Sequence, residues 1–440
     1  MFWVIYNLFF SVVFLIMLPR FALRMIKRGG YRHGFLERFG CFSKAGLERA
    51  GNVPRLWIHA VSVGESQLAF RFADRVRKRH PAIRFAFSVT TSTARRLVES
   101  RLSSQDIVFY FPLDLPVFLN RIWRIVRPTG IVLTESELWP NVLRMAEKHA
   151  TPVVLINGRI SAKSHHGYRM LRTVFQRVLS IPRCFCVQTT GDAERLSDIG
   201  VPPNRLHVVG TMKYDDTGAS KEQINTLRRS LESTGFSGPG RLTLLGGSTW
   251  PGEEAALLQA YASLHRANPS VRLVLVPRHA ERRMEVASLV RRMGLNPILR
   301  SGKTDGGVDL PEAASILLAD TTGELCALYA CADIVFVGKS LCSTGGQNII
   351  EPAVYGKPIV VGPHMENFPD VIRDFLAADA LVQVSDSKAL STALQQLSDD
   401  TGYRMTLGEK ARAVVEQNRG TLDRTIRHVE SGLGMSAQVD

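Results

Sequence analysis

Short apolar segments that alternate with helical segments constrain the fold of this chain more than any other feature. Each has the length of a strand and consists mostly of aliphatic and aromatic residues, which favours burial on both faces of a sheet. They lie at 56–58, 85–89, 107–111, 131–133, 153–156, 184–187, 206–209, 242–245, 273–276, 316–318, 334–337 and 359–361. Because strands that alternate with helices form parallel, doubly wound sheets, the sequence predicts an α/β fold.

The chain has 440 residues, which is too long for one ordinary hydrophobic core, so two domains are expected. The alternation breaks between Asp215 and Arg241, where the sequence is polar and contains Gly and Ser. Two such domains in tandem would leave a cleft, and ligands of open α/β sheets bind beyond the carboxyl ends of the strands. The expected divisions are an anchor with a basic segment at 1–30, an α/β domain at 31–214, a linker at 215–240, an α/β domain at 241–418 and a helix or tail at 419–440.

The first residues predict a membrane anchor. The segment 2–18 is apolar except for Asn7 and Ser11, and as a helix it would span about 26 Å, slightly less than a hydrocarbon core of roughly 30 Å. No basic segment precedes it and no cleavage site follows, so a removed signal peptide is disfavoured. It is followed by the basic residues Arg20, Arg24, Lys27, Arg28 and Arg32. The positive-inside rule then places the following chain in the cytoplasm. A peripheral amphipathic helix is the alternative.

The charge is distributed unevenly along the chain. Residues 1–214 carry 32 Lys and Arg against 13 Asp and Glu, a net charge of +19, whereas the remainder has a net charge of −4 and the whole chain +15. A basic half suggests an anionic partner, which phospholipid, a phosphorylated substrate or nucleic acid would each satisfy.

Several kinds of site are not indicated. The six cysteines form no CxxC pair and no disulfide-like spacing, so free thiols in a reducing compartment are expected and a zinc site is not. The chain lacks a P-loop lysine motif, a defensible Ser-His-Asp spacing and a DxD sequence at a strand end. No metal-bridged diphosphate ligand is therefore indicated.

Candidate polar residues of the first half follow buried strands. Glu65 begins a helix in the turn SVGES, where it could serve chemistry or only offset the helix dipole. Glu135 and Glu137 follow the strand at 131–133, and Lys213 follows the last strand of this half. The segment 156–177 is basic and lacks acidic residues, and it includes Arg159 and Lys163. It is either a solvated helix or a phosphate-binding face, since guanidinium groups bind phosphate in a bidentate manner.

The second half has candidate residues at four strand ends that should share one sheet edge. They are Ser248 and Thr249, then Pro277 and Arg278, then 320–324, and finally the glycine loop 338–347 with Glu351 beyond it. Glycine loops and helix starts offer backbone N–H groups to phosphate. An ordinary strand-to-helix turn is the alternative for the glycine loop taken alone.

These segments resemble, in order, the 3-deoxy-D-manno-octulosonic acid (Kdo) transferases of lipopolysaccharide assembly. The resemblance extends from about Tyr31 to Asn418. The segments that carry it are HAVSVGES, TESELWPN, INGRISAKS, GTMKYD, GSTWPGEE, LVPRHAER, DTTGEL and GGQNIIEPAVYGKPIVVGP. It implies a GT-B fold of two doubly wound domains facing a cleft, and transfer of Kdo from CMP-Kdo to a lipid A precursor. It also implies that the catalytic domains lie at the cytoplasmic leaflet of the bacterial inner membrane. Members of the family that it resembles need no metal or other cofactor.

The same resemblance implies roles for individual residues. It implies that Glu65 is the base that deprotonates the acceptor hydroxyl, and that Glu135 and Lys213 stabilise the transition state. The 31–214 domain would bind the acceptor and the 241–418 domain the CMP-sugar. The implied CMP site comprises Pro277, Arg278, Thr322, Gly323, Glu324, Asn348, Ile349, Ile350 and Glu351. Lys339 and Gln347 depart from the family pattern, which usually has glycine and histidine at these positions.

Two other functions remain as alternatives. A GT-B transferase or epimerase that uses a UDP-sugar would have the same domain architecture. A basic, membrane-tethered nucleic-acid-binding protein would fit the charge. It would also need aromatic side chains interleaved with the basic residues, of which the sequence has few.

Overall fold

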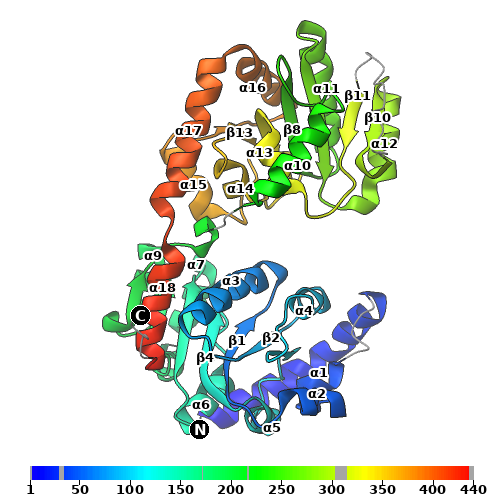
Figure 1. Ribbon diagram of the computed structural model, residues 1–440. Coiled ribbons are helices and arrows are strands. Elements are labelled where there is room, and N and C mark those ends of the chain that lie inside the picture. Colours follow the sequence, from blue (N-terminus) through cyan, green and yellow to red (C-terminus); the bar gives the residue numbers. More distant parts are fainter. Residues whose placement is uncertain (1, 29–33, 171, 216–217, 303–314, 436–440) are drawn as a thin grey trace. The chain divides into compact units, whose positions relative to one another are not determined.

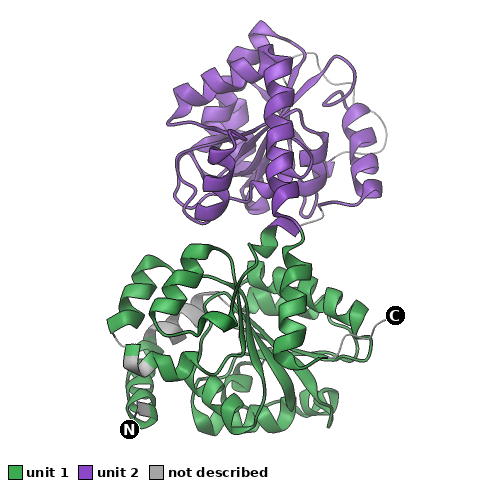
Figure 2. Ribbon diagram, turned by 90° about the vertical axis from the view of Figure 1, so that its left-hand side faces the viewer, with its two compact units in different colours: residues 1–213, 420–440 green, residues 214–419 purple. Residues whose placement is uncertain are grey.

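The structure is a computed structural model that describes residues 2–28, 34–170, 172–215, 218–302 and 315–435 (Figure 1). The chain forms two compact units (Figure 2). Unit 1 comprises residues 1–213 and 420–440, and unit 2 comprises residues 214–419. Each unit is built around its own parallel sheet, so the prediction of two α/β domains is confirmed.

The described part of unit 1 has a sheet of seven strands in the order β3-β2-β1-β4-β5-β6-β7, all parallel to their neighbours. The chain reverses its direction of winding between β1 and β4, which is where doubly wound sheets bind ligands. The strands are β1 (Arg55–Ala60), β2 (Phe85–Val89), β3 (Ile107–Tyr110), β4 (Pro128–Thr134), β5 (Val153–Gly158), β6 (Cys184–Val187) and β7 (Leu206–Val208).

Helices cover both faces of this sheet. Along β1, Leu56 and Ile58 contribute to one hydrophobic cluster and Trp57 to the other, as the alternation of side chains along a strand requires. Figure 1 shows α3 and α4 on one face and α5 and α6 on the other. The helical elements are η1 (Phe35–Phe39), α2 (Lys44–Ala50), α3 (Val63–Arg79), α4 (Ser92–Glu99), α5 (Pro116–Val126), α6 (Pro140–Lys148), α7 (Ala162–Met170), α8 (Arg172–Leu179), α9 (Thr190–Asp198), η2 (Pro203–Arg205), η3 (Met212–Asp215) and α18 (Thr421–Leu433).

The described part of unit 2 repeats this plan with the strand order β10-β11-β9-β8-β12-β13-β14, again all parallel. Its winding reverses between β8 and β12. The strands are β8 (Leu242–Thr249), β9 (Val271–Pro277), β10 (Asn296–Leu299), β11 (Ser315–Leu318), β12 (Ile334–Val337), β13 (Ile359–Val361) and β14 (Val382–Gln383). The helical elements are α10 (Lys221–Glu232), α11 (Glu253–Ala267), η4 (Ala280–Arg282), α12 (Arg283–Arg292), η5 (Arg300–Gly302), α13 (Leu325–Cys331), α14 (Ile350–Ala353), α15 (Pro369–Ala377), α16 (Ser387–Asp399) and α17 (Thr401–Asn418).

The segments expected as a linker at 215–240 and as a helix or tail at 419–440 each contain a packed helix. The predicted linker contains α10, which begins with a capping box formed by Ser220 and Gln223 and buries Leu227 and Leu231 in the core of unit 2. The predicted tail contains α18, which contacts β5 and β6 of unit 1 because its apolar face completes that core. A helix was expected at 419–440 and is present, but its packing against unit 1 and the helix within 215–240 depend on distant partners that local patterns do not show. Residues 216–217 and 436–440 lie outside the described residues.

The predicted N-terminal helix exists as α1 (Phe2–Arg28), and one side of it contacts unit 1. The Tyr6 hydroxyl donates to Asp114 Oδ2 at 2.7 Å, and Asn141 Nδ2 donates to Asn7 Oδ1 at 2.6 Å. Its half-buried residues recur at helical spacing and are Trp3, Tyr6, Asn7, Phe10, Ser11 and Phe14. Its exposed large apolar residues are Val4, Ile5, Leu8, Phe9, Val12, Val13, Leu15, Ile16, Met17 and Leu18.

The prediction that this segment spans a membrane is not confirmed. None of the helices formed by the described residues has both the length and the apolar character needed to cross a bilayer. The polar side chains of Tyr6 and Asn7, which interrupt the apolar surface, are used in contacts with unit 1. The side chains of the basic residues after it, Arg20, Arg24, Lys27, Arg28 and Arg32, lie outside the described residues.

Candidate active site

Two glutamates follow the strands on either side of the reversal point in unit 1. Glu65 lies in the first turn of α3, directly after β1, and Glu135 is the first residue after β4. Strands β1 and β4 are hydrogen-bonded neighbours with their carboxyl ends at one edge. The structure therefore brings together two residues that are far apart in the sequence.

Glu65 is held by a capping box at the start of α3. The Ser62 side chain accepts from the Glu65 N–H, and the Glu65 side chain accepts from the Ser62 N–H. Glu65 Oε1 accepts from Ser62 N at 3.2 Å and from Ser62 Oγ at 2.8 Å. Glu65 Oε2 accepts from Val61 N at 3.0 Å and lies 2.8 Å from the hydroxyl oxygen of Thr134. The carboxylate is thus oriented by four neighbouring donors.

Glu135 has a different environment. Its φ angle of 54° lies in the left-handed region, which non-glycine residues seldom adopt outside functional sites and turns. Burial raises the pKa of its carboxyl, the charge of Glu65 raises it further, and the charges of Lys213 and Arg159 act in the opposite direction. A carboxyl with a raised pKa in a group of charges is a common feature of catalytic sites.

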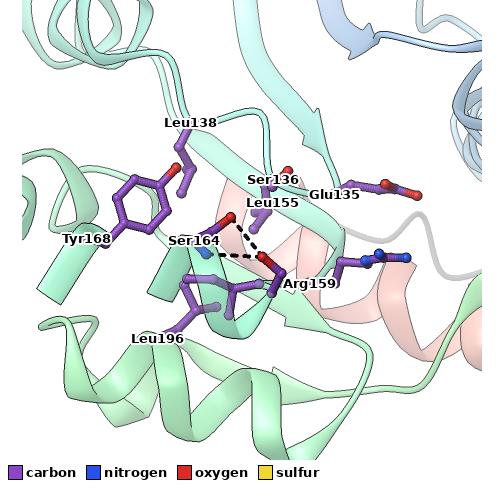
Figure 3. Close-up of a pocket in the computed structure, with 10 residues that line it drawn as sticks. Glu135, Ser136, Leu138, Leu155, Arg159, Ser164, Tyr168 and Leu196 are labelled. Atoms are coloured by element: carbon purple, nitrogen blue, oxygen red, sulfur yellow. Dashed lines mark hydrogen bonds between the residues drawn. The ribbon is translucent and has the colours of Figure 1, made fainter. Parts of the chain in front are cut away.

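Glu135 lines a cavity of about 260 Å³ at this edge of the sheet (Figure 3). Arg159, directly after β5, lines the same cavity, and Figure 3 shows its guanidinium and the Glu135 carboxylate pointing to the same side. The hydroxyl-bearing residues of the lining are Ser136, Ser161, Ser164 and Tyr168. The cavity is therefore polar and suited to an oxygen-rich ligand.

Glu137 supports the wall of this site. The Trp139 indole N–H donates to Glu137 Oε2 at 2.9 Å, and His59 Nε2 lies 3.7 Å from the same oxygen. Burial opposes ionisation of Glu137, but His59 and Trp139 together lower the pKa of its carboxyl. Burial, and then the charge of Glu137, raises the pKa of Tyr168. The sequence analysis did not identify His59 and Thr134 as site residues, because neither stands out by charge or spacing.

The two predicted lysines of unit 1 lie in different surroundings. Lys213 is half-buried in η3, and its charge reaches Glu135. Lys163 is exposed on α7, a helix in which no residue is buried, and it does not line the cavity. Lys213 therefore belongs with the glutamates, whereas Lys163 contributes charge to the surface.

The four predicted strand ends of unit 2 share one sheet edge, because β11, β9, β8 and β12 are successive parallel neighbours. Arg278 is exposed after β9, and its backbone N–H donates to the Thr249 carbonyl at 3.0 Å. Ser248 and Thr249 are buried, with Ser248 at a φ angle of 53° and the Thr249 hydroxyl 3.0 Å from Glu254 Oε1. Pro277 ends β9 and is buried.

Three N–H groups at the start of the glycine loop after β12 are used within the protein. The N–H groups of Lys339 and Ser340 donate to Glu253 at 2.8 Å, and that of Leu341 donates at 2.9 Å. Glu253 also accepts from Trp250 N at 2.9 Å and is fully buried at the start of α11. Glu253 therefore occupies the N–H groups at the start of this loop, and Gly345 N donates to Glu366 Oε2 at 2.6 Å.

The remaining predicted donor-site residues differ in exposure. Glu324 is bound by Arg300 through two hydrogen bonds of 2.6 and 2.7 Å, and Arg300, with Thr321, lowers the pKa of its carboxyl despite partial burial. Gly323 and Glu324 line a cavity of about 330 Å³, and Thr322 is exposed beside them.

Asn348 precedes α14, and its Nδ2 donates to Oε1 of Glu351 within that helix at 3.1 Å. Ile349 and Ile350 lie in the core with no exposed surface, so their side chains support this pair rather than reach a ligand. Among the described residues no group of three or more His, Cys, Asp and Glu side chains is arranged to hold a metal ion.

Two parallel, doubly wound units are the building blocks of the GT-B class of proteins. Solved structures with this fold include UDP-GlcNAc 2-epimerase from Neisseria meningitidis bound to UDP-GlcNAc, with a TM-score of 0.57 and 11% identity over 86% of this chain and 100% of that one. An Anabaena protein in complex with UDP gives a TM-score of 0.55 and 15% identity over 86% of this chain and all of its own. These likenesses establish the fold alone.

Sequence relatives identify the family. A family model described as 3-deoxy-D-manno-octulosonic-acid transferase matches residues 33–216. The 3-deoxy-D-manno-octulosonic acid transferase of Haemophilus influenzae is 30% identical over 409 residues, which are 92% of each chain. That of Bordetella pertussis is 32% identical over 427 residues, 94% of this chain and 97% of its own. The chain therefore belongs to the Kdo transferase family and is a glycosyltransferase, as the sequence resemblance predicted.

Proposed function

We propose that this enzyme transfers Kdo from CMP-Kdo to a lipid A precursor during lipopolysaccharide assembly, with inversion of the anomeric centre and without a metal ion. The observation that carries the proposal is the pair Glu65 and Glu135 at the reversal point of unit 1, in a chain of this family. Lys213 and Arg159 supply positive charge beside the pair. This arrangement can both activate a hydroxyl and stabilise charge.

Glu65 is the proposed general base. A sugar hydroxyl is a poor nucleophile, so a carboxylate within hydrogen-bond reach must take its proton as the attack develops. Attack from the face opposite the departing CMP inverts the anomeric centre, by analogy with the two-carboxylate geometry of glycoside hydrolysis. Glu135 and Lys213 stabilise the charge that develops in the transition state.

The donor is proposed to bind at the carboxyl edge of the unit 2 sheet. Arg278 is the exposed cation at this edge and would meet the CMP phosphate. Ser248, Thr249 and Pro277 shape the turn beside it, and Thr322, Gly323 and Glu324 the next one. Asn348 and Glu351, supported by Ile349 and Ile350, are proposed to bind the nucleoside. Because Glu253 occupies the N–H groups of 339–341, the Arg278 side chain rather than the start of the glycine loop would hold the phosphate.

The acceptor is proposed to approach unit 1. A lipid A precursor carries phosphate groups, and Arg159 and Lys163 belong to the basic half of the chain. The same charge would hold this half against the anionic cytoplasmic leaflet of the inner membrane. The exposed apolar side of α1 supports this location, because large apolar side chains gathered on one surface mark a place of contact.

Donor choice tests the proposal. The purified enzyme is incubated with a lipid A precursor and either CMP-Kdo or a panel of UDP-sugars, and the lipid products are analysed by mass spectrometry. We expect the mass of the acceptor to increase by whole Kdo units with CMP-Kdo only. Transfer from a UDP-sugar alone would establish the alternative transferase.

A further inference from the structure

The hydroxyl of Thr134 lies between two hydrogen-bond acceptors. Thr134 is the last residue of β4 and is fully buried. Its Oγ1 lies 2.9 Å from the His59 carbonyl oxygen and 2.8 Å from Glu65 Oε2. The β1–β4 register, which pairs His59 with Leu133, places it there. A hydroxyl has only one proton, so it can donate to only one of these acceptors at a time.

The lone pairs of Glu65 show why this choice matters. A carboxylate has about four acceptor positions, two on each oxygen. Val61 N and the Thr134 hydroxyl are directed at Oε2, and Ser62 N and Ser62 Oγ at Oε1. Backbone N–H groups cannot turn away. The Ser62 hydroxyl also accepts from Glu65 N, which fixes its orientation. Thr134 is therefore the donor that can release a position on Glu65 and still keep a hydrogen bond.

We propose that Thr134 is a positioning residue that allows Glu65 to be either an anion or a neutral acid. When Glu65 is charged, the hydroxyl donates to Oε2. When Glu65 takes a proton on Oε2, the hydroxyl turns to the His59 carbonyl and frees the acceptor position that the proton then uses. In both states the buried Thr134 hydroxyl keeps a hydrogen bond, and losing it would be unfavourable for a buried polar group.

This inference rests on the proposed function. The acceptor O–H bond breaks as its oxygen bonds to the anomeric carbon of Kdo, and the bond from that carbon to the CMP phosphate oxygen breaks. The leaving CMP takes the bonding electron pair. The proton moves to Glu65 Oε2, and the Thr134 hydroxyl rotates without losing its own proton.

Other ionisable groups belong to the same network of charges as Glu65, through their effects on Glu135 and Glu137. They are His59 on β1, Glu135 and Glu137 after β4, Arg159 after β5 and Lys213 in η3. All of them remain when only Thr134 is replaced. A difference between Thr134 variants therefore reports on the hydroxyl and not on these charges.

Thr134→Val and Thr134→Ser separate the hydroxyl from the volume of the side chain. We expect Thr134→Val to lower kcat for Kdo transfer by about 10- to 100-fold, the effect of losing a hydrogen bond to a charged group. The KM for CMP-Kdo should change little. The acidic limb of the pH–rate profile should move to higher pH, because the charged form of Glu65 has lost a donor. Thr134→Ser should restore both rate and profile.

Thr243→Val is a matched control. Thr243 is also buried in a strand, and its hydroxyl donates to the carbonyl oxygen of Phe236 at 2.8 Å in unit 2. This variant should lose some thermal stability but keep the wild-type pH–rate profile. If Thr134→Val does not fold, Thr134→Cys, whose thiol is a weak donor, replaces it in the comparison with Thr134→Ser.

Three outcomes contradict the proposals in different ways. A folded Thr134→Val enzyme with wild-type kcat and profile overturns the role of the hydroxyl and leaves the proposed function intact. Equal losses in the Val and Ser variants assign Thr134 to packing and also overturn it. A folded wild type that transfers no Kdo from CMP-Kdo refutes the proposed function, and this inference with it.

Discussion

Glu65 in unit 1 and Glu253 in unit 2 occupy corresponding places in two similar folds. Each lies in the first turn of the helix after a strand at the reversal point, and each has four neighbouring donors, two for each oxygen. For Glu253 all four donors are backbone N–H groups. For Glu65 two of the four are hydroxyls, those of Ser62 and Thr134. The two carboxylates differ in whether a donor can turn away.

This difference separates a structural carboxylate from a reactive one. Glu253 is completely buried and connects the start of α11 to the loop after β12, where Gly338 approaches it so closely that an added Cβ would lie 2.7 Å from Oε2. A proton on Glu253 would face a fixed N–H group and displace it. Glu65 is half-buried and has a hydroxyl that adapts to both states. Donors that cannot rotate therefore indicate a structural carboxylate, whereas donors that can rotate allow a carboxylate to take up a proton.

The largest effect is expected from Glu65→Gln. The amide keeps the shape of the side chain but cannot act as a base, so the single-turnover rate of Kdo transfer should fall by about 10²- to 10⁴-fold. Titration with CMP and calorimetric unfolding should match the wild type, apart from about 1 kcal/mol for the altered capping box. A variant that turns over like the wild type would remove Glu65 from the mechanism.

Glu253→Gln should mainly affect stability. The amide NH2 would face two N–H donors in a buried site, so the free energy of unfolding of unit 2 should fall by roughly 3–5 kcal/mol. Denaturant unfolding measures this change. Glu285→Gln, which replaces an exposed carboxylate hydrogen-bonded to Arg282, is the control and should cost less than about 1 kcal/mol. Equal stability of the two variants would contradict the assignment of Glu253 as structural.

Arg278→Ala tests whether side chains bind the donor phosphate in unit 2. Loss of a charge-assisted hydrogen bond should raise the KM for CMP-Kdo by about 10- to 100-fold with a smaller change in kcat. Arg272→Ala is the control, since Arg272 lies at the opposite end of β9 and donates to Pro269 O at 2.6 Å. An unchanged donor KM in Arg278→Ala would place the phosphate elsewhere.

The smallest change in stability is expected from Glu135→Gln, and this change depends on pH. Burial and the charge of Glu65 raise the pKa of Glu135, so the folded protein keeps this proton where the unfolded chain has released it. Its contribution to stability is therefore present at low pH and is lost as pH rises through the folded-state pKa. Glu135→Gln should stabilise unit 1 by about 1 kcal/mol at about pH 8 and leave it unchanged at about pH 4. Denaturant unfolding at both pH values measures this difference, and the opposite dependence on pH would contradict the raised pKa.

Much of the fold followed from local sequence patterns. The apolar segments predicted twelve of the fourteen described strands, because a strand buried on both faces must be apolar along its length. The two missed strands, β10 and β14, lie at the edges of the unit 2 sheet and are not fully buried. The positions of Glu65, Glu135 and Arg278 after such strands then placed them at carboxyl edges. Helix α10 could also have been found, since Ser220 and Gln223 form a recognisable capping box.

The rest depended on contacts between distant residues. Glu253 bonds to residues more than 85 positions away in the sequence, so the occupied glycine loop could not be foreseen from its glycines. Helix α18 returns to unit 1 from the far end of the chain. The position of the Thr134 hydroxyl between His59 and Glu65 depends on the register of β1 and β4, which local patterns do not determine.

Product analysis of the wild type and Glu65→Gln side by side tests the central claim most directly. Equal amounts of folded enzyme are incubated with CMP-Kdo and a lipid A precursor, and the lipid products are identified and quantified by mass spectrometry. If Glu65 is the general base, we expect Kdo-bearing lipid from the wild type and almost none from Glu65→Gln. Equal amounts of product from both enzymes, or none from the folded wild type, would contradict it.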